Sequence, residues 1–247
     1  MKAVLLCAGY ATRMGALTAN FPKALLPVLD RPILDYLIDD LASLDRVSEL
    51  VVVTNHRDHP HFVTWLDRRS AADAPPIRLI DDGTTGNENR LGAIGDLALA
   101  IEDVGGDEPL LVAAGDNLFR IDWAAWLRDL EAATSSMVLI AHETDRDRLR
   151  RSGVAELNAE GRLVRLWEKP DDPPSEFCCP PLYWLTPAAL AEIGPFRAAN
   201  PDADAPGHLI AWLAGRVEIR SHEMRGKRLD VGDAESYSAA EDWLRSH

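Results

Sequence analysis

The sequence predicts an α/β fold in which a mixed, mostly parallel sheet is flanked by helices. Short apolar runs of four or five residues alternate with longer segments whose apolar residues recur at helical spacing. This alternation is typical of parallel strands joined by crossover helices. The 247 residues, 47% of them apolar, are sufficient for one large domain with a sizeable core.

Up to residue 145, strand-like and helix-like segments alternate regularly. Strands are expected at 3–7, 50–53, 77–80, 110–113 and 137–141, and helices at 32–44, 59–68, 91–104 and 123–132. Pro32 suits the first turn of its helix, where a missing N–H has no consequence. Right-handed crossovers would place a ligand at the carboxyl ends of the strands.

After residue 145 the pattern changes and predicts a small substrate lobe. The segments 153–157 and 162–168 flank a turn sequence, Asn158 to Gly161, and therefore predict a hairpin. Further strands are expected at 182–185, 217–220 and 227–231, and helices at 187–193, 208–214 and 234–245. Because no long linker separates the halves 1–145 and 146–247, we expect one domain over residues 1–247.

Charge and cysteine content exclude several classes of function. A formal net charge of −14 opposes binding to nucleic acid or to anionic membranes, and it requires any phosphate site to be locally basic or metal-bridged. No apolar stretch reaches membrane-spanning length, and the first strand begins without a leader, so we expect a cytoplasmic protein. The three cysteines form neither a disulfide framework nor a zinc-binding pattern.

The loop after the first strand carries a glycine turn with Thr12 and Arg13, and Lys23 follows ten residues later. It lacks both the Gly-Lys-Ser/Thr end of a Walker A loop and the three glycines of a dinucleotide loop. Glycine allows backbone amides to approach an anion, and arginine offers a fork for phosphate oxygens. From the loop alone, a polyphosphate site and a surface loop with two solvated cations are equally good interpretations.

A wider comparison of motifs favours the polyphosphate site. Ala8-Gly9-Tyr10-Ala11-Thr12-Arg13-Met14, followed by Phe21-Pro22-Lys23-Ala24-Leu25-Leu26-Pro27-Val28, resembles the composite signature of the sugar-phosphate nucleotidylyltransferases, which include the glucose-1-phosphate thymidylyltransferases. The resemblance implies that the loop from Ala8 to Thr12 wraps the nucleotide triphosphate, that Arg13 grips it, and that Lys23 contacts the phosphates at the reacting centre. Ala11 departs from the signature, which usually has glycine there.

Two aspartates follow predicted strands more than a hundred residues apart. Asp116 and Asp230 could each be a turn residue, since aspartate is common after strands. Their contexts, Gly115-Asp116-Asn117 and Arg228-Leu229-Asp230-Val231-Gly232-Asp233, resemble the two metal positions of the same family, which implies a Mg²⁺ site. Asp233 is assigned to capping the final helix. Arg228 stands where the family usually has an aromatic residue.

Two further segments resemble the substrate contacts of the family. Leu166-Trp167-Glu168-Lys169-Pro170, with Gly153 before it, implies an acceptor pocket in which Glu168 reaches a sugar hydroxyl and Lys169 holds the sugar phosphate. Asn89 and Gly92 lie in the segment that contacts the nucleotide base and ribose. Arg90 either contacts phosphate or pairs with a carboxylate. Pro180-Pro181 replaces a Thr-Gly pair, so hydrogen bonding in the acceptor pocket must differ.

The resemblance therefore implies a Rossmann-like nucleotide-diphospho-sugar transferase fold, with a nucleotide-binding half (1–145) and an acceptor-binding half (146–247). The implied reaction joins an NTP and a sugar-1-phosphate into an NDP-sugar and pyrophosphate, assisted by Mg²⁺. The competing function within the same chemistry is a cytidylyltransferase acting on a non-sugar phosphate or phosphonate. Outside that chemistry, a non-catalytic nucleotide sensor and a glycosyltransferase also compete, although no Asp-x-Asp motif follows Gly115. The expected partners are the two substrates, with a homo-oligomer left open.

Overall fold

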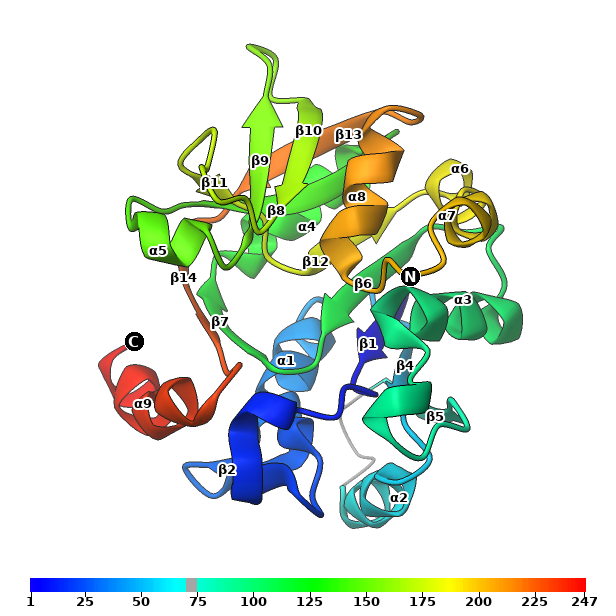
Figure 1. The fold of residues 1–247 in the computed structure, drawn as a ribbon, viewed down its shortest axis with the longest axis vertical. Coiled ribbons are helices and arrows are strands. Elements are labelled where there is room, and N and C mark those ends of the chain that lie inside the picture. Colours follow the sequence, from blue (N-terminus) through cyan, green and yellow to red (C-terminus); the bar gives the residue numbers. More distant parts are fainter. Residues whose placement is uncertain (70–74) are drawn as a thin grey trace.

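The computed structural model, described for residues 1–69 and 75–247, has a ten-stranded sheet at its centre (Figure 1). Its strands are β1 (Lys2–Leu6), β4 (Glu49–Thr54), β5 (Ile77–Asp81), β6 (Leu110–Ala114), β8 (Ser136–His142), β9 (Gly153–Leu157), β10 (Leu163–Glu168), β11 (Phe177–Cys178), β12 (Leu182–Leu185) and β13 (Ile219–Glu223). They are arranged in the order β10-β9-β11-β8-β12-β6-β1-β4-β5, with β13 paired to β8.

The sheet confirms the predicted mixed α/β fold. β6, β1, β4 and β5 are parallel, which is the pairing expected of strands joined by crossover helices. β12, from the second half of the chain, lies antiparallel between β6 and β8 and so joins both halves in one sheet. β9 and β10 form the predicted antiparallel hairpin. The single-domain assignment remains a prediction.

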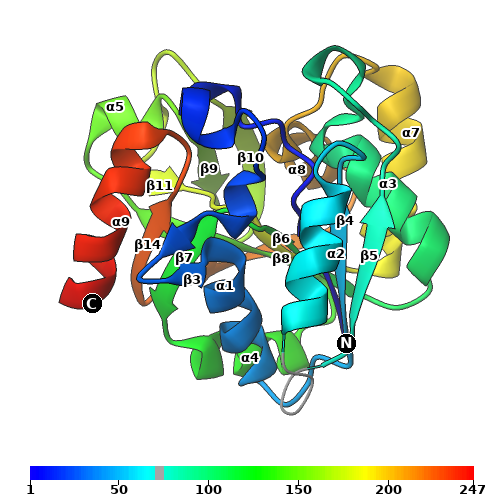
Figure 2. The same ribbon diagram turned by 90° about the horizontal axis from the view of Figure 1, so that it is seen from below.

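Helices cover both faces of the sheet. One face carries α1 (Ile33–Ala42), α2 (His59–Arg68) and α4 (Trp123–Ala132), and the other carries α3 (Gly92–Val104), α6 (Pro187–Leu190), α7 (Ile193–Ala199) and α8 (Pro206–Ala214). Figure 2 shows α3 and α7 together on one side of the sheet. Strand β1 serves both faces, because Leu5 packs toward α1 while Val4 packs toward α3.

The end of the chain returns to the loop that follows β1. β14 (Gly226–Asp230) pairs antiparallel with β7 (Asn117–Ile121), and α9 (Ala234–Ser246) packs against β14 and the 3₁₀ turn at Thr12–Thr18 (Figure 1). Met14, Leu118, Val231 and Leu244 share a small core there, beside the hairpin of β2 (Pro27–Val28) and β3 (Arg31–Pro32). This packing fixes the position of Asp230 relative to the opening loop.

Most predicted elements are present with boundaries shifted by a few residues, but one prediction is wrong. The expected helix at 187–193 is two helices, α6 and α7. Pro195 explains the break, because proline has no N–H and its ring clashes with the carbonyl four residues earlier, so it is tolerated only in the first turn of the new helix. β2, β3, β7, β11 and α5 (Arg146–Leu149) were not predicted. Among the described residues, no helix has the length and apolar character needed to span a membrane.

Candidate active site

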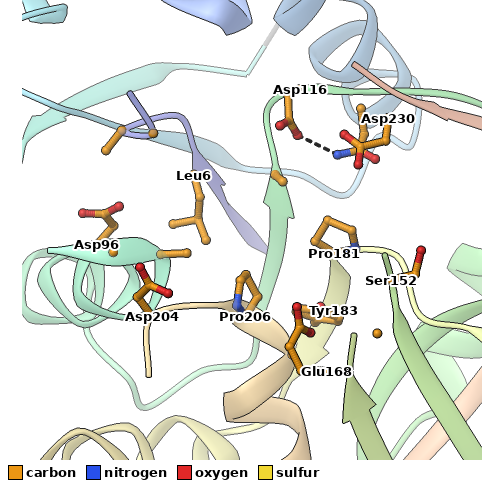
Figure 3. Close-up of a pocket in the computed structure, with 18 of the residues that line it drawn as sticks. Leu6, Asp96, Asp116, Ser152, Glu168, Pro181, Tyr183, Asp204, Pro206 and Asp230 are labelled. Atoms are coloured by element: carbon orange, nitrogen blue, oxygen red, sulfur yellow. Dashed lines mark hydrogen bonds between the residues drawn. The ribbon is translucent and has the colours of Figure 1, made fainter. Parts of the chain in front are cut away.

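A pocket of about 460 Å³ opens at the carboxyl ends of β1 and β6 and is lined by residues from both halves of the chain. Figure 3 shows its two ends. Asp116 and Asp230 lie at one end, Asp96 and Asp204 lie at the other, and Leu6 lies between them. Glu168 and Tyr183 line the side formed by the second half. The pocket therefore occupies the place where an open α/β sheet presents its ligands.

Asp116 and Asp230 are brought together by the pairing of β7 with β14. Asp230 lies opposite Asn117, and the amide of Val231 donates a hydrogen bond to the Asp116 carbonyl, 3.0 Å away. One oxygen of the Asp116 carboxylate, Oδ2, lies 2.5 Å from Lys23 Nζ. The other, Oδ1, accepts a 2.7 Å hydrogen bond from Asn117 Nδ2. The sequence-predicted Lys23, Asp116 and Asp230 thus form one cluster.

The two carboxylates differ in their electrostatics. Desolvation alone would raise the pKa of Asp116, but the Lys23 ammonium outweighs it and holds the pKa below its usual value. Desolvation and, second, the Asp116 carboxylate raise the pKa of Asp230, although that side chain remains accessible from the pocket. The arrangement is an acidic pair with a single lysine partner. A further cation between the two carboxylates would lower their mutual repulsion.

This donor set fits a magnesium ion. Mg²⁺ binds through one or two carboxylates together with substrate phosphates and water, and does not require a cage made only of protein. Asp116 and Asp230 supply two such carboxylates. Residues 1–69 and 75–247 contain no group of three or more His, Cys, Asp or Glu side chains arranged to hold a metal ion. A metal held by these two carboxylates would complete its coordination with water or with substrate oxygens.

The opening loop approaches the pocket with part of its length. Ala8, Gly9 and Arg13 line it, whereas Thr12 is exposed and does not. The Tyr10 hydroxyl lies 2.8 Å from Thr84 Oγ1 and ties the loop to the segment before α3. Ala11 has a φ of 49° and a ψ of 41°, which is the left-handed conformation that glycine adopts without strain. The loop therefore keeps a glycine-like turn despite the Cβ of Ala11.

Gly92 and its neighbours form the other end of the pocket. Gly92 has a φ of 74°, and a Cβ there would lie 2.4 Å from Asp204 Cβ, so only glycine allows this approach. Arg90 also lines this end, and its Nη2 lies 2.7 Å from Asp204 Oδ2, so in this structure it pairs with a carboxylate. Asn89 does not line the pocket. Its Oδ1 accepts a hydrogen bond from the Gly86 amide and so shapes the preceding turn.

Asp82 and Asp96 line the same end of the pocket and were not predicted as site residues. Asp96 is 4% exposed, and one of its carboxylate oxygens has no hydrogen-bond partner among the described residues. Burial and the nearby Asp82 raise the pKa of Asp96 to about 8. An aspartate within the apolar pattern of α3 is the only sequence signal that could have indicated this buried carboxyl.

On the acceptor side, Glu168 and Gly153 line the pocket but Lys169 does not. The Glu168 carboxylate occupies the space that a Cβ on Gly207 would fill, at 1.9 Å, so glycine at the start of α8 makes room for it. Lys169 has a φ of 48°, its side chain is 62% exposed, and its Nζ lies 3.5 Å from Glu168 Oε1. Arg151, Tyr183 and Arg228 also line the pocket.

Comparisons with known proteins agree with this geometry. The family model described as nucleotidyl transferase matches residues 2–246. A UTP–glucose-1-phosphate uridylyltransferase of Haloferax volcanii is 28% identical over 99% of this chain and 97% of its own length. A glucose-1-phosphate thymidylyltransferase of Mycolicibacterium smegmatis is 29% identical over 100% of this chain and 83% of its own length.

Solved structures show the same fold. A putative glucose-1-phosphate thymidylyltransferase from Bacillus anthracis, in complex with sucrose, superimposes with a TM-score of 0.83 at 22% identity and covers 100% of this chain and 96% of that one. A UDP-glucose pyrophosphorylase complexed with UDP-glucose gives 0.81 at 21% identity, with 100% and 99% covered. The Rossmann-like transferase fold predicted from the motifs is confirmed.

Proposed function

The chain belongs to the nucleotidyl transferase family, and from that premise we propose that it joins an NTP to a sugar-1-phosphate and releases pyrophosphate. The observation that carries the proposal is the cluster of Lys23, Asp116 and Asp230 at one end of a pocket shared by both halves of the chain. The glucose-1-phosphate nucleotidyltransferases among its relatives support a sugar phosphate as the acceptor. They do not favour a cytidylyltransferase of non-sugar phosphates.

In this proposal the nucleotide enters along the opening loop. Gly9 leaves open space beside the backbone, so phosphate oxygens can approach the chain closely. Arg13 lines the pocket and its guanidinium is close to Gly232, next to Asp230. It would bind the β- and γ-phosphates, and Lys23 would neutralise charge that develops as pyrophosphate leaves.

The chemical step is an in-line displacement. An oxygen of the acceptor phosphate forms a bond to the α-phosphorus, and the bond from that phosphorus to the α–β bridging oxygen breaks, so pyrophosphate leaves with the electron pair. No side chain needs to become covalently attached, so the rate depends on positioning and charge neutralisation. Asp116 and Asp230 would hold Mg²⁺, which supplies Lewis-acid polarisation and a template for the phosphate oxygens.

The second half of the chain would orient the acceptor. Glu168 can accept hydrogen bonds from two neighbouring hydroxyls of a sugar, and the space left by Gly207 and Gly153 fixes where its carboxylate lies. Tyr183 closes the same side of the pocket. We place the enzyme in the cytoplasm, since its three free cysteines suit a reducing compartment.

A substrate matrix tests the function. ATP, CTP, GTP, UTP and dTTP are each combined with glucose-1-phosphate, other sugar-1-phosphates and choline phosphate in the presence of Mg²⁺, and pyrophosphate release is measured. We expect turnover with at least one sugar-1-phosphate. Turnover confined to choline phosphate, or none with any pair, would overturn the proposal.

A further inference from the structure

Four arginines line the pocket, and they are not equivalent. Arg90 is paired with the Asp204 carboxylate. Arg13, Arg151 and Arg228 form no salt bridge within residues 1–69 and 75–247, although the chain carries 40 Asp and Glu residues against 26 Lys and Arg. A guanidinium left without a carboxylate in such an acidic protein is a candidate for an anionic ligand.

Arg228 is half-buried and donates a hydrogen bond to a buried side chain, whereas Arg151 is exposed and donates to the Asp147 carbonyl. Arg228 lies two residues before Asp230 on β14, so the two side chains share one face of the strand, and both line the pocket. Its Nη1 donates to Asn117 Oδ1 at 3.0 Å. Asn117 is 1% exposed, and its Nδ2 donates to Asp116 in turn. The guanidinium is therefore oriented through the same network that holds the Asp116 carboxylate.

The field of Arg228 reaches both parts of the site. Arg228 shares a face of β14 with Asp230, and it lines the pocket together with Tyr183 on the acceptor side. Burial raises the pKa of Tyr183 well above its usual value, and the charge on Arg228 opposes that shift. Arg228 thus lies within electrostatic reach of the acidic pair and of the acceptor wall. The attacking phosphate has to lie between these two places.

Lys169, by contrast, is poorly placed for this task. Its side chain is largely exposed, does not line the pocket, and is close to Glu168. The resemblance assigned the acceptor phosphate to this lysine. The position that the family usually fills with an aromatic side chain is Arg228 in this chain, and its side chain lines the pocket.

We propose that Arg228 binds the phosphate of the acceptor and holds its attacking oxygen next to the α-phosphorus of the nucleotide. The inference rests on the proposed function and deepens it, because it assigns the nucleophile's phosphate to a residue of β14. A planar fork can donate two parallel hydrogen bonds to phosphate oxygens, and its charge offsets repulsion between the acceptor dianion, the triphosphate and Asp230. The acceptor affinity should therefore depend on Arg228 more than the nucleotide affinity does.

The test compares Arg228→Gln, Arg228→Lys and Arg225→Gln with the wild type. Arg225 is exposed, lies outside the pocket and precedes β14, so Arg225→Gln is the matched control for loss of one arginine. KM for each substrate is measured with the other saturating, and binding of the sugar-1-phosphate is titrated without nucleotide. In Arg228→Gln we expect the acceptor KM and Kd to rise by about tenfold or more, while the NTP KM stays within about twofold. Arg228→Lys should be intermediate, and Arg225→Gln unchanged.

Two results would overturn the proposal: an unchanged acceptor KM in Arg228→Gln, or a nucleotide KM that rises as much as the acceptor KM. If Arg228→Gln melts at a lower temperature, Arg228→Lys carries the test, and an acceptor KM equal to that of the wild type would then count against a bidentate contact. A larger acceptor effect in Lys169→Gln than in Arg228→Gln would return the phosphate to the lysine. Failure of the proposed function can be told apart from failure of this inference, because the wild type itself would then show no turnover.

Discussion

The ammonium of Lys23 lies 2.5 Å from Asp116 Oδ2, across 93 residues of sequence. Lys23 comes from a short 3₁₀ turn after the opening loop, and Asp116 comes from the turn between β6 and β7. The contact joins the turn that follows the opening loop to the acidic pair. Lys23 therefore lowers the pKa of Asp116, and in the proposed function it would also lie beside the phosphates of the nucleotide.

Replacing Lys23 by Gln should lower kcat by about 10²–10³-fold, because a positioned charge at the leaving group is lost. The same change removes the group that keeps the pKa of Asp116 low, so the two carboxylates should repel more strongly. Pyrophosphate release under saturating substrates measures the first effect. Lys227→Gln is the control, since Lys227 is exposed, lies outside the pocket, and its ammonium forms a hydrogen bond with His247 at the end of the chain. A Lys23→Gln enzyme with near-normal kcat would exclude this role.

Asp116→Asn and Asp230→Asn should each abolish Mg²⁺-dependent turnover, because each removes one of two proposed metal carboxylates. The two variants should differ in stability. Asp230→Asn removes a like-charge neighbour of Asp116 and should raise the melting temperature without metal, whereas Asp116→Asn also removes the partner of Lys23.

The measurements are turnover against Mg²⁺ concentration and melting temperature with and without Mg²⁺. Asp202→Asn, an exposed change outside the pocket, serves as the control. Near-normal activity in either carboxylate variant would contradict the metal assignment. The metal assignment would also be contradicted if Mg²⁺ did not change the melting temperature of the wild type in the presence of substrate.

The sequence predicted most of the sheet because its strands are encoded locally, as apolar runs that located β1, β4 and β6. A strand followed by an aspartate also fits a turn residue, so only the family resemblance indicated Asp116 as a metal ligand, and that role stays a prediction. β7 was missed, since Asn117–Ile121 follows β6 after only two residues and reads as a continuation of the turn. Yet β7 is the element that brings β14, and with it Asp230, to Asp116. Their proximity could be expected only from the family resemblance.

Residues that act through long-range contacts were the hardest to predict. The Arg90–Asp204 pair joins segments 114 residues apart, and neither sequence segment indicates its partner. Lys169 belongs to a motif that matches the family closely, but its left-handed backbone and its exposure are not visible in the motif. Asp96 was not recognised as a site residue, because the helical spacing of α3 does not reveal that one of its carboxyl groups is buried.

The buried Asp96 predicts a specific dependence of stability on pH. Its pKa is about 8 in the folded protein against 3.8 for the ordinary group, so between these values the folded state holds a proton that the unfolded state has released. The free energy of unfolding should therefore fall as pH rises from about 4 to about 8, by at most about 1.4 kcal/mol per pH unit from this group, and then level off. Asp96→Asn should remove this contribution.

Urea unfolding of the wild type, Asp96→Asn and Glu102→Gln at several pH values measures the effect. Asp40, whose pKa burial raises to about 6, contributes a similar slope at lower pH to all three proteins, so the difference between the curves isolates Asp96. Glu102 is exposed on the same helix, and its variant should run parallel to the wild type. We expect Asp96→Asn to be the more stable protein at about pH 9. Parallel curves for Asp96→Asn and wild type would show that Asp96 is ionised in the fold.

Gly92→Ala should damage both stability and activity, because the added Cβ would lie 2.4 Å from Asp204 Cβ and the backbone φ is 74°. Gly83→Ala separates the steric clash from the backbone strain. Gly83 has a φ of 76° and nothing within 4 Å of the added Cβ, so it carries the backbone strain without the clash. We expect Gly83→Ala to cost about 1–2 kcal/mol of unfolding free energy and Gly92→Ala clearly more.

A second change can relieve the clash and so identify it. Asp204→Gly removes the Cβ that Gly92→Ala would strike, although it also removes the partner of Arg90. The double variant should therefore lose less unfolding free energy than the two single variants lose together. Unfolding midpoints of the four proteins measure this coupling. Additive effects would mean that the loop holding Asp204 moves freely away from α3. In that case the Arg90–Asp204 pair could not fix this end of the pocket.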